Sequence, residues 1–176
     1  MSLLGKFLFL SALCLPAAAM STSLPAMAAP SSQSVESQFI QVKIYRLAED
    51  PLTSQPVVLL SDSDEERIMP IWIGPFEADA LNSEMLAVPK IRPQTHDLLE
   101  SIMREADLKI LRVLITHMDE NIYYATVWIE RGGSIIKVDS RPSDGMVMAL
   151  KFNAAIFVSE SLFRDKSFPI EKEEEE

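Results

Sequence analysis

The sequence predicts an α+β domain with a mixed, largely antiparallel sheet and three helices, in the order β-β-β-α-α-β-β-β-α-β. Residues 39–47 alternate between apolar and polar side chains for much of their length, as a half-buried strand does. Two short turns, at 119–121 and 131–133, favour antiparallel neighbours. Between these regions, an apolar stripe at helical spacing runs through residues 98–106.

The first half of the domain contains three expected strands and two expected helices. The strands cover 39–47, 56–60 and 67–73, and the polar loop between the second and third predicts a hairpin. Gly74-Pro75 ends the third strand, and a proline is tolerated in the first turn of a helix, so a helix is expected over 75–86. Thr95 is the expected N-cap of the second helix.

The second half is expected to form an antiparallel meander followed by a helix and a strand. Its strand-like runs cover 108–117, 121–130 and 134–139. Ser143 can cap a third helix over 143–152, and Asp144 suits its positive end. A short strand over 155–158 completes the order.

The first 28 residues have the features of a cleavable signal peptide. Lys6 precedes an apolar run to about residue 19, which is shorter than the ~20 apolar residues of a membrane span. Residues 26–28 (Ala-Met-Ala) predict cleavage after Ala28, with 17–19 as a weaker site. An uncleaved anchor and a lipoprotein at Cys14 are the less favoured alternatives. The protein is therefore expected to be exported to the periplasm or the extracellular space, with no membrane span after cleavage.

The remaining chain divides into a flexible lead-in (29–37), one domain (38–168) and an acidic disordered tail (169–176). Cys14 is the only cysteine and leaves with the signal peptide, so no disulfide is expected. The net charge is −10, and loss of Lys6 makes it −11. This charge argues against a broadly basic nucleic-acid surface, although not against a local basic patch.

Three polar clusters stand at the ends of expected elements: Glu77 with Asp79, residues 92–97 (RPQTHD) and residues 139–144 (DSRPSD). In the last two, an Arg-Pro pair precedes a hydroxyl residue and an acid, and helix capping explains most of this pattern. Arg92 and Arg141 lie before helix starts, where they could bind a phosphate or pair with the acids of their own loops.

His96 is one of two histidines in the chain and is a candidate general base, although most such histidines serve only in packing or lie on the surface. The sequence holds no strong metal-binding motif. Asp139 with Asp144 or Glu77 could hold Mg²⁺ weakly through oxygen ligands, so a metal requirement is left open.

Three stretches of the chain resemble the bifunctional nuclease domain family of bacteria and plants. Residues 69–78 (MPIWIGPFEA), 92–99 (RPQTHDLL) and 139–145 (DSRPSDG) are similar to the family's segments LPIWIG-x-x-EA, RP-x-THDL and DARPSDA, in the same order. The likeness extends over about 39–163. Ser140, Gly145, Lys151 and Asp107 depart mildly from the family pattern, and export is a larger departure.

The resemblance implies cleavage of DNA and RNA by one converging site. It implies phosphate binding by Arg92 and Arg141, and catalytic roles for five other residues: Glu77, His96, Asp97, Asp139 and Asp144. The alternative is a non-enzymatic exported binding or assembly module in which the Arg–Asp pairs lock helix starts to the sheet. A homo-oligomer is expected under either reading, because a sheet edge and apolar runs such as 110–115 need cover.

Overall fold

An eight-stranded sheet, ordered β6-β5-β4-β7-β1-β2-β3-β8, carries the fold in the computed structural model, which describes residues 38–170. The strands are β1 (Phe39–Glu49), β2 (Pro56–Asp62), β3 (Arg67–Trp72), β4 (Lys109–Asp119), β5 (Ile122–Arg131), β6 (Ser134–Ser140), β7 (Ala155–Ser159) and β8 (Phe168–Pro169). The helices are α2 (Pro75–Met85), α3 (Thr95–Glu105), α4 (Pro142–Phe152) and α5 (Glu160–Lys166). The expected signal peptide and lead-in, and residues 171–176 of the expected tail, lie outside the described residues.

The predicted fold class and element order are confirmed, with α5 and β8 as additions. Helix α5 is a fourth helix that the sequence analysis did not expect, because its seven residues are too few to show a clear period. The Ser159 hydroxyl caps it by accepting a hydrogen bond from Leu162 N–H at 3.4 Å. Strand β8 pairs Pro169 with Arg67, so the sheet extends one residue into the segment assigned to the tail.

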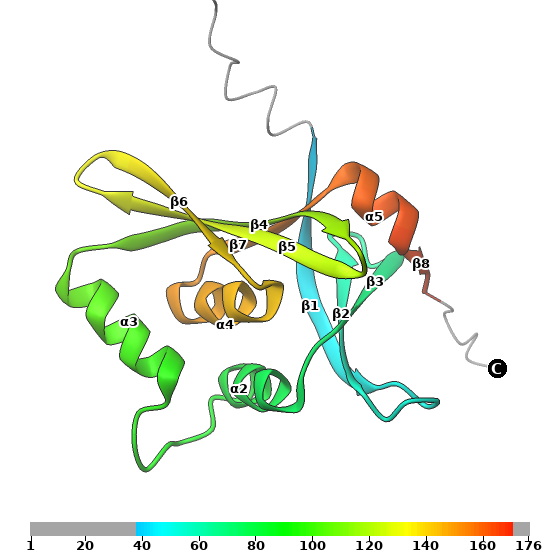
Figure 1. Cartoon of the computed structure of the whole chain (residues 1–176), viewed down its shortest axis with the longest axis horizontal. Coiled ribbons are helices and arrows are strands. Elements are labelled where there is room, and N and C mark those ends of the chain that lie inside the picture. The colour runs from blue at the N-terminus through cyan, green and yellow to red at the C-terminus, as the bar shows by residue number, and fades with distance from the viewer. Residues whose placement is uncertain (1–37, 171–176) are drawn as a thin grey trace, which may run out of the picture.

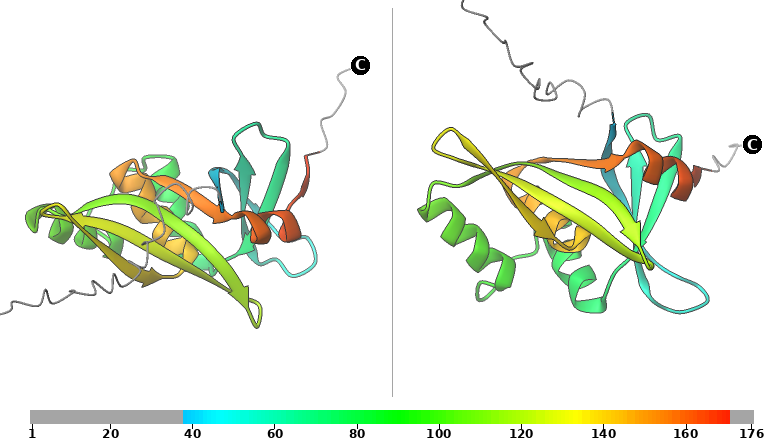
Figure 2. Two further views of the ribbon diagram at one scale, coloured as in Figure 1. Left: turned by 90° about the horizontal axis from the view of Figure 1, so that it is seen from above. Right: turned by 45° about the horizontal axis from the view of Figure 1, so that its top comes forward.

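The sheet pairing follows the expected hairpin and meander. β2 and β3 form the predicted antiparallel hairpin, and β4, β5 and β6 form the predicted meander. The pair β4–β7 is parallel, because the chain returns to the sheet through α4. The meander crosses the β1–β2–β3 half at a steep angle, so the sheet is strongly twisted (Figure 2).

Helices α2, α3 and α4 cover one face of this sheet (Figure 1). α4 packs on β4 and β5 and contacts both α2 and α3, while α2 also reaches β2. α4 lies so close to β4 that a Cβ on Gly145 would come within 2.8 Å of a Val113 methyl carbon. The core is therefore the layer between α4 and the sheet, where Met146, Leu60 and Ile115 are fully buried.

Two capping predictions need correction. Gln94 rather than Thr95 is the N-cap of α3, and its N–H donates to Asp97 Oδ2 at 2.7 Å. Arg141 rather than Ser143 is the N-cap of α4, and Ser143 lies buried in the first turn. Helix α3 begins at Thr95, as expected, but with Gln94 as its cap, whereas α4 begins at Pro142, one residue before the expected Ser143.

Helix α2 ends in a Schellman motif with an alanine in the position that favours glycine. Val88 N–H donates to Ser83 O at 2.9 Å and Ala87 N–H donates to Glu84 O at 3.2 Å. Ala87 has a φ of 49°. In this left-handed conformation the Cβ comes too close to the following carbonyl oxygen, a contact that glycine avoids.

We predict that Ala87→Gly stabilises the protein by about 0.5–1 kcal/mol, since relief of the left-handed strain exceeds the extra entropy of glycine in the unfolded chain. Urea unfolding measures the change. The control is Ala106→Gly at the C-cap of α3, where φ is −86° and no such strain exists. Ala106→Gly should leave stability unchanged or lower it, and an equal gain in both variants would contradict this explanation.

Candidate active site

Each of the helices α2, α3 and α4 carries an acidic residue at its third position. These residues are Glu77, Asp97 and Asp144. Carboxylates at this position are stabilised by the free N–H groups and the positive end of the helix dipole. Glu77 and Asp144 come together around one arginine, and Asp97 faces a different set of cations.

Arg141 joins the starts of α2 and α4. Its Nη1 donates to Glu77 Oε1 at 2.5 Å, its Nε to Asp144 Oδ2 at 2.7 Å and its Nη2 to Asp144 Oδ1 at 3.1 Å. The two bonds to Asp144 form a bidentate pair. These hydrogen bonds, with that of Asp144 the strongest, raise the pKa of Arg141 above its usual range, so the guanidinium stays charged.

Asp144 also holds His96, which lies at the start of α3. The distance from His96 Nε2 to Asp144 Oδ1 is 3.0 Å. Burial alone would raise the pKa of Asp144, but hydrogen bonds from Arg141 and His96 outweigh it and lower that pKa. Asp144 is therefore an ionised acceptor at neutral pH, and in the tautomer that donates Nε2–H to it, Nδ1 of His96 has a lone pair that can accept a proton.

Glu77 reaches Arg141 because the residue before α2 has no side chain. A Cβ on Gly74 would lie 2.2 Å from Glu77 Oε2. Gly74 has a φ of −75°, so glycine is needed here for space and not for an unusual backbone conformation.

A pocket of about 460 Å³ opens beside this cluster. Its lining is drawn from the starts of all three helices: Phe76, Glu77, Asp79, Ala80, Gln94, Thr95, His96, Arg141 and Asp144. A second pocket, of about 370 Å³, shares Glu77 and Arg141 with the first and includes Trp72, Asn121 and Tyr123. Arg141 thus lines both pockets, and 64% of its side chain is exposed.

The structure brings together four of the seven residues that the sequence singled out: Glu77, His96, Arg141 and Asp144. Arg92 is exposed and, within residues 38–170, makes no hydrogen bond or ion pair. Asp139 lies on the edge strand β6, outside both pockets. Asp97 points into a separate ionic network. The described part of the chain also contains no cluster of three or more His, Cys, Asp or Glu residues arranged to hold a metal ion.

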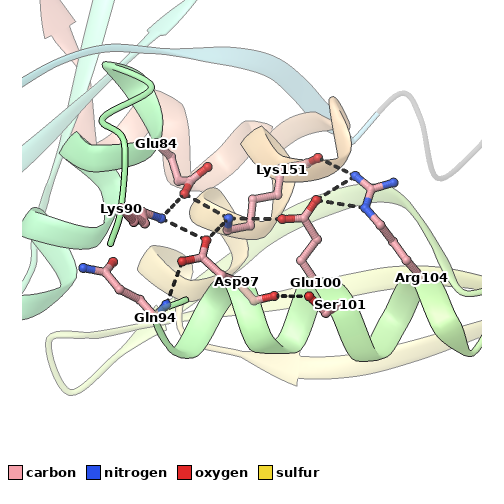
Figure 3. A network of polar contacts seen from close by, with 8 residues as sticks. All are labelled: Glu84, Lys90, Gln94, Asp97, Glu100, Ser101, Arg104 and Lys151. Atoms are coloured by element: carbon pink, nitrogen blue, oxygen red, sulfur yellow. Dashed lines mark hydrogen bonds and ion pairs between the residues drawn. The ribbon is translucent and has the colours of Figure 1, made fainter. Parts of the chain in front are cut away.

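The ionic network around Asp97 joins α2, α3 and α4 (Figure 3). Lys151, with 5% of its side chain exposed, donates to Asp97 and to Glu100 at 3.2 Å, and lies 2.9 Å from Glu84. Lys90 adds contacts of 2.5 Å to Glu84 and 2.9 Å to Asp97.

These contacts shift the pKa values of the network in opposite directions. Burial opposes ionisation of both Lys151 and Asp97, but their mutual hydrogen bonds outweigh it, so the pKa of Lys151 is raised and that of Asp97 is lowered. Asp97 therefore fixes α3 rather than lining the pocket. The role of Lys90 cannot be recognised in the sequence, because a lysine in a loop carries no local signal of its distant partners.

We predict that Lys151→Met destabilises the protein by about 3 kcal/mol, because three carboxylates lose a nearly buried partner. Arg104→Met is the control, since Arg104 is 56% exposed and its pair with Glu100 is worth about 1 kcal/mol or less. Urea unfolding with matched m-values compares the two. Equal losses in both variants would show that Lys151 is no more important than a surface pair.

Comparisons with known proteins agree with the arrangement of these motifs. Residues 58–171 match the family model of the bifunctional nuclease domain. Two uncharacterized proteins of Mycobacterium tuberculosis, from strains CDC 1551 and H37Rv, are each 32% identical to the chain over 136 residues, which cover 77% of this chain and 81% of each relative. The Gly74–Glu77 turn, the start of α3 and the Arg141–Asp144 turn all lie within the matched region, and the chain belongs to the bifunctional nuclease domain family.

Proposed function

We propose that this protein is a nuclease that hydrolyses phosphodiester bonds of DNA and RNA at the cluster of Glu77, His96, Arg141 and Asp144. One observation carries the proposal. A histidine oriented by a carboxylate and a permanently charged arginine share the edge of one pocket, in a chain of the bifunctional nuclease domain family. A base and a fixed cation are the two groups that phosphodiester hydrolysis most needs.

Arg141 is the proposed phosphate-binding group. A guanidinium has five N–H donors, and three of them are used by Glu77 and Asp144. The remaining two can donate to the non-bridging oxygens of a phosphodiester and stabilise the charge that grows on them in the transition state. Both carboxylates hold the guanidinium in place before substrate arrives.

His96 is the proposed general base. With its Nε2 proton directed at Asp144, Nδ1 can accept a proton from water or from a ribose 2′-hydroxyl. Asp144 stabilises the imidazolium that forms, and that imidazolium can return the proton to the leaving oxygen. A water nucleophile would serve both DNA and RNA, while the 2′-hydroxyl route exists only for RNA.

The pocket is acidic, and this limits how a substrate can bind. Glu77, Asp79 and Asp144 line it beside Arg141 and the imidazole of His96. A phosphate must therefore either displace a carboxylate from Arg141 or enter together with a counter-cation. Nuclease activity must therefore be measured both with Mg²⁺ and with a chelator.

The same geometry favours a second candidate function, a non-enzymatic binding or assembly module. Arg141 is already hydrogen-bonded to two carboxylates, and this arrangement can lock α2 to α4 without any substrate. In this case Arg141→Ala would lower the melting temperature, and the protein as isolated would cleave neither polymer.

We predict that His96→Ala lowers the rate of cleavage of both single-stranded DNA and RNA at least about 100-fold, since removal of a general base typically costs that much. His117→Ala is the matched control, because His117 stacks on Tyr124 and lies outside the pocket. Rates are measured on labelled oligonucleotides with Mg²⁺ and with chelator, beside melting temperatures. Wild-type protein that cuts neither polymer, or a fully active His96→Ala variant, would contradict the nuclease proposal.

We also propose that the protein acts outside the cytoplasm after loss of residues 1–28. The support is the Lys6 start, the apolar run and the Ala-Met-Ala site at 26–28. Of the helices within residues 38–170, none has the length and apolar character needed to cross a bilayer.

Mass spectrometry of the protein recovered from cell fractions is expected to find an N-terminus at Ala29 outside the cytoplasm. Ala28→Arg should block cleavage and leave the longer chain on the membrane, because the cleavage site requires a small residue. Recovery of the full-length wild-type chain from the cytoplasm would contradict export.

A further inference from the structure

Strand β6 is an open edge of the sheet with apolar side chains on it. It pairs only with β5 in the described sheet, and six of its seven residues are exposed. Ile135, Ile136 and Val138 are 54%, 38% and 43% exposed. An edge of this length with apolar residues favours pairing with another strand unless something covers it.

Helix α3 has its apolar side facing away from the protein. Its charged residues Asp97, Glu100 and Arg104 face inward, where they meet Lys151 and the end of α4. Three of its four large apolar residues are left outside, since Leu98, Leu99 and Ile102 are 58%, 42% and 55% exposed, while Met103 is buried. A surface helix normally has the opposite arrangement, so this face indicates a contact with another molecule.

The two apolar surfaces lie on the same side of the molecule. α3 contacts α4, and Figure 1 shows it on the side of the molecule where the β5–β6 hairpin lies, away from β2 and β3. Val138 pairs with the buried Val127, and Ile136 with Ile129, which packs on the core. Because directly paired residues share a face, Val138 and Ile136 point to the helix-bearing face of the sheet.

We propose that a second copy of this chain covers both surfaces, through antiparallel pairing of β6 with β6 about a two-fold axis at Val138. The axis is perpendicular to the sheet, so the two sheets join into one and both sets of helices stay on the same face. The outward sides of the two α3 helices then face each other across the axis, next to the joined strands.

The charges on β6 select this register. A two-fold axis perpendicular to the sheet must pass midway between the two copies of one residue. Residues paired across the axis point to the same face, and neighbouring residues of a strand do not. An axis at Lys137 would place two lysines opposite each other, and an axis at Ile136 would place lysine opposite Ile135. An axis at Val138 places Lys137 of each copy opposite Asp139 of the other, which gives two ion pairs.

The local structure supports these ion pairs. Lys137 and Asp139 pair with Trp128 and Thr126 of β5, on the face opposite the helices. Lys137 Nζ lies 4.2 Å from the centroid of the Trp128 ring, which holds the ammonium on that face. Asp139 is exposed and makes no ion pair within residues 38–170, so its carboxylate is available to the second copy.

Sedimentation velocity over a concentration series of the purified protein tests the proposal. The wild type should be a dimer, and Lys137→Asp should weaken dimerisation about 10- to 100-fold because it places like charges opposite each other twice. The swapped pair Lys137→Asp/Asp139→Lys should restore the dimer. Lys43→Asp, the same change at an exposed lysine on β1, should leave it intact.

A variant of α3 tests the second surface. Ile102→Glu should also weaken the dimer, because it places a charge on the helix face that the second copy covers. A wild type that stays monomeric throughout the series, or a Lys137→Asp dimer as tight as the wild type, would overturn the proposal. Failure of the charge swap to restore association would overturn the Val138 register. None of these results depends on nuclease activity.

Discussion

The contact of Arg141 with Glu77 and Asp144 determines how the rest of the candidate site is arranged. Arg141 is the N-cap residue of α4, directly after β6, so the end of the meander sets its backbone position. Its guanidinium reaches the start of α2, and through Asp144 it reaches His96 on α3. Without this group, two carboxylates would face each other at the start of two helices, and His96 would lose its ionised partner.

The ionic network around Asp97 fixes α3 against α2 and α4, and this fixes the position of His96. His96 and Asp97 are neighbours on α3, and one turns to Asp144 while the other turns to Lys151 and Lys90. Polar contacts thus add to the apolar packing of the buried Met103 in anchoring α3, and they specify direction as well as distance. The consequence is an α3 whose apolar side remains outside, so one arrangement accounts for both a positioned histidine and an exposed apolar surface.

Local chemistry was enough to predict strands β1 to β7, the turns of the meander and the starts of α2, α3 and α4 to within one or two residues. It was not enough to separate the roles of Glu77, Asp97 and Asp144, because all three occupy the third position of a helix and look alike in sequence. Their partners are 64, 54 and 3 residues away, and only packing decides which acid meets which cation. Arg92 and Asp139 belong to the same motifs as His96 and Arg141, but neither lines the pocket.

Asp139 and Arg141 connect the proposed dimer to the proposed active site. They are two residues apart, one on the outermost strand β6 and one at the pocket, directly after the end of β6. In the proposed dimer Arg141 is three residues from the axis, which separates the two guanidinium-bearing positions by six residues, or about 20 Å along the joined strands. Successive phosphates of one DNA strand are about 3.4 Å apart along the helix axis, so this separation corresponds to about six nucleotides. A two-fold pair of sites also matches the opposite polarity of two paired strands. Asp139, which lies outside the pocket, would therefore set the distance between the two pockets that bind a nucleic acid.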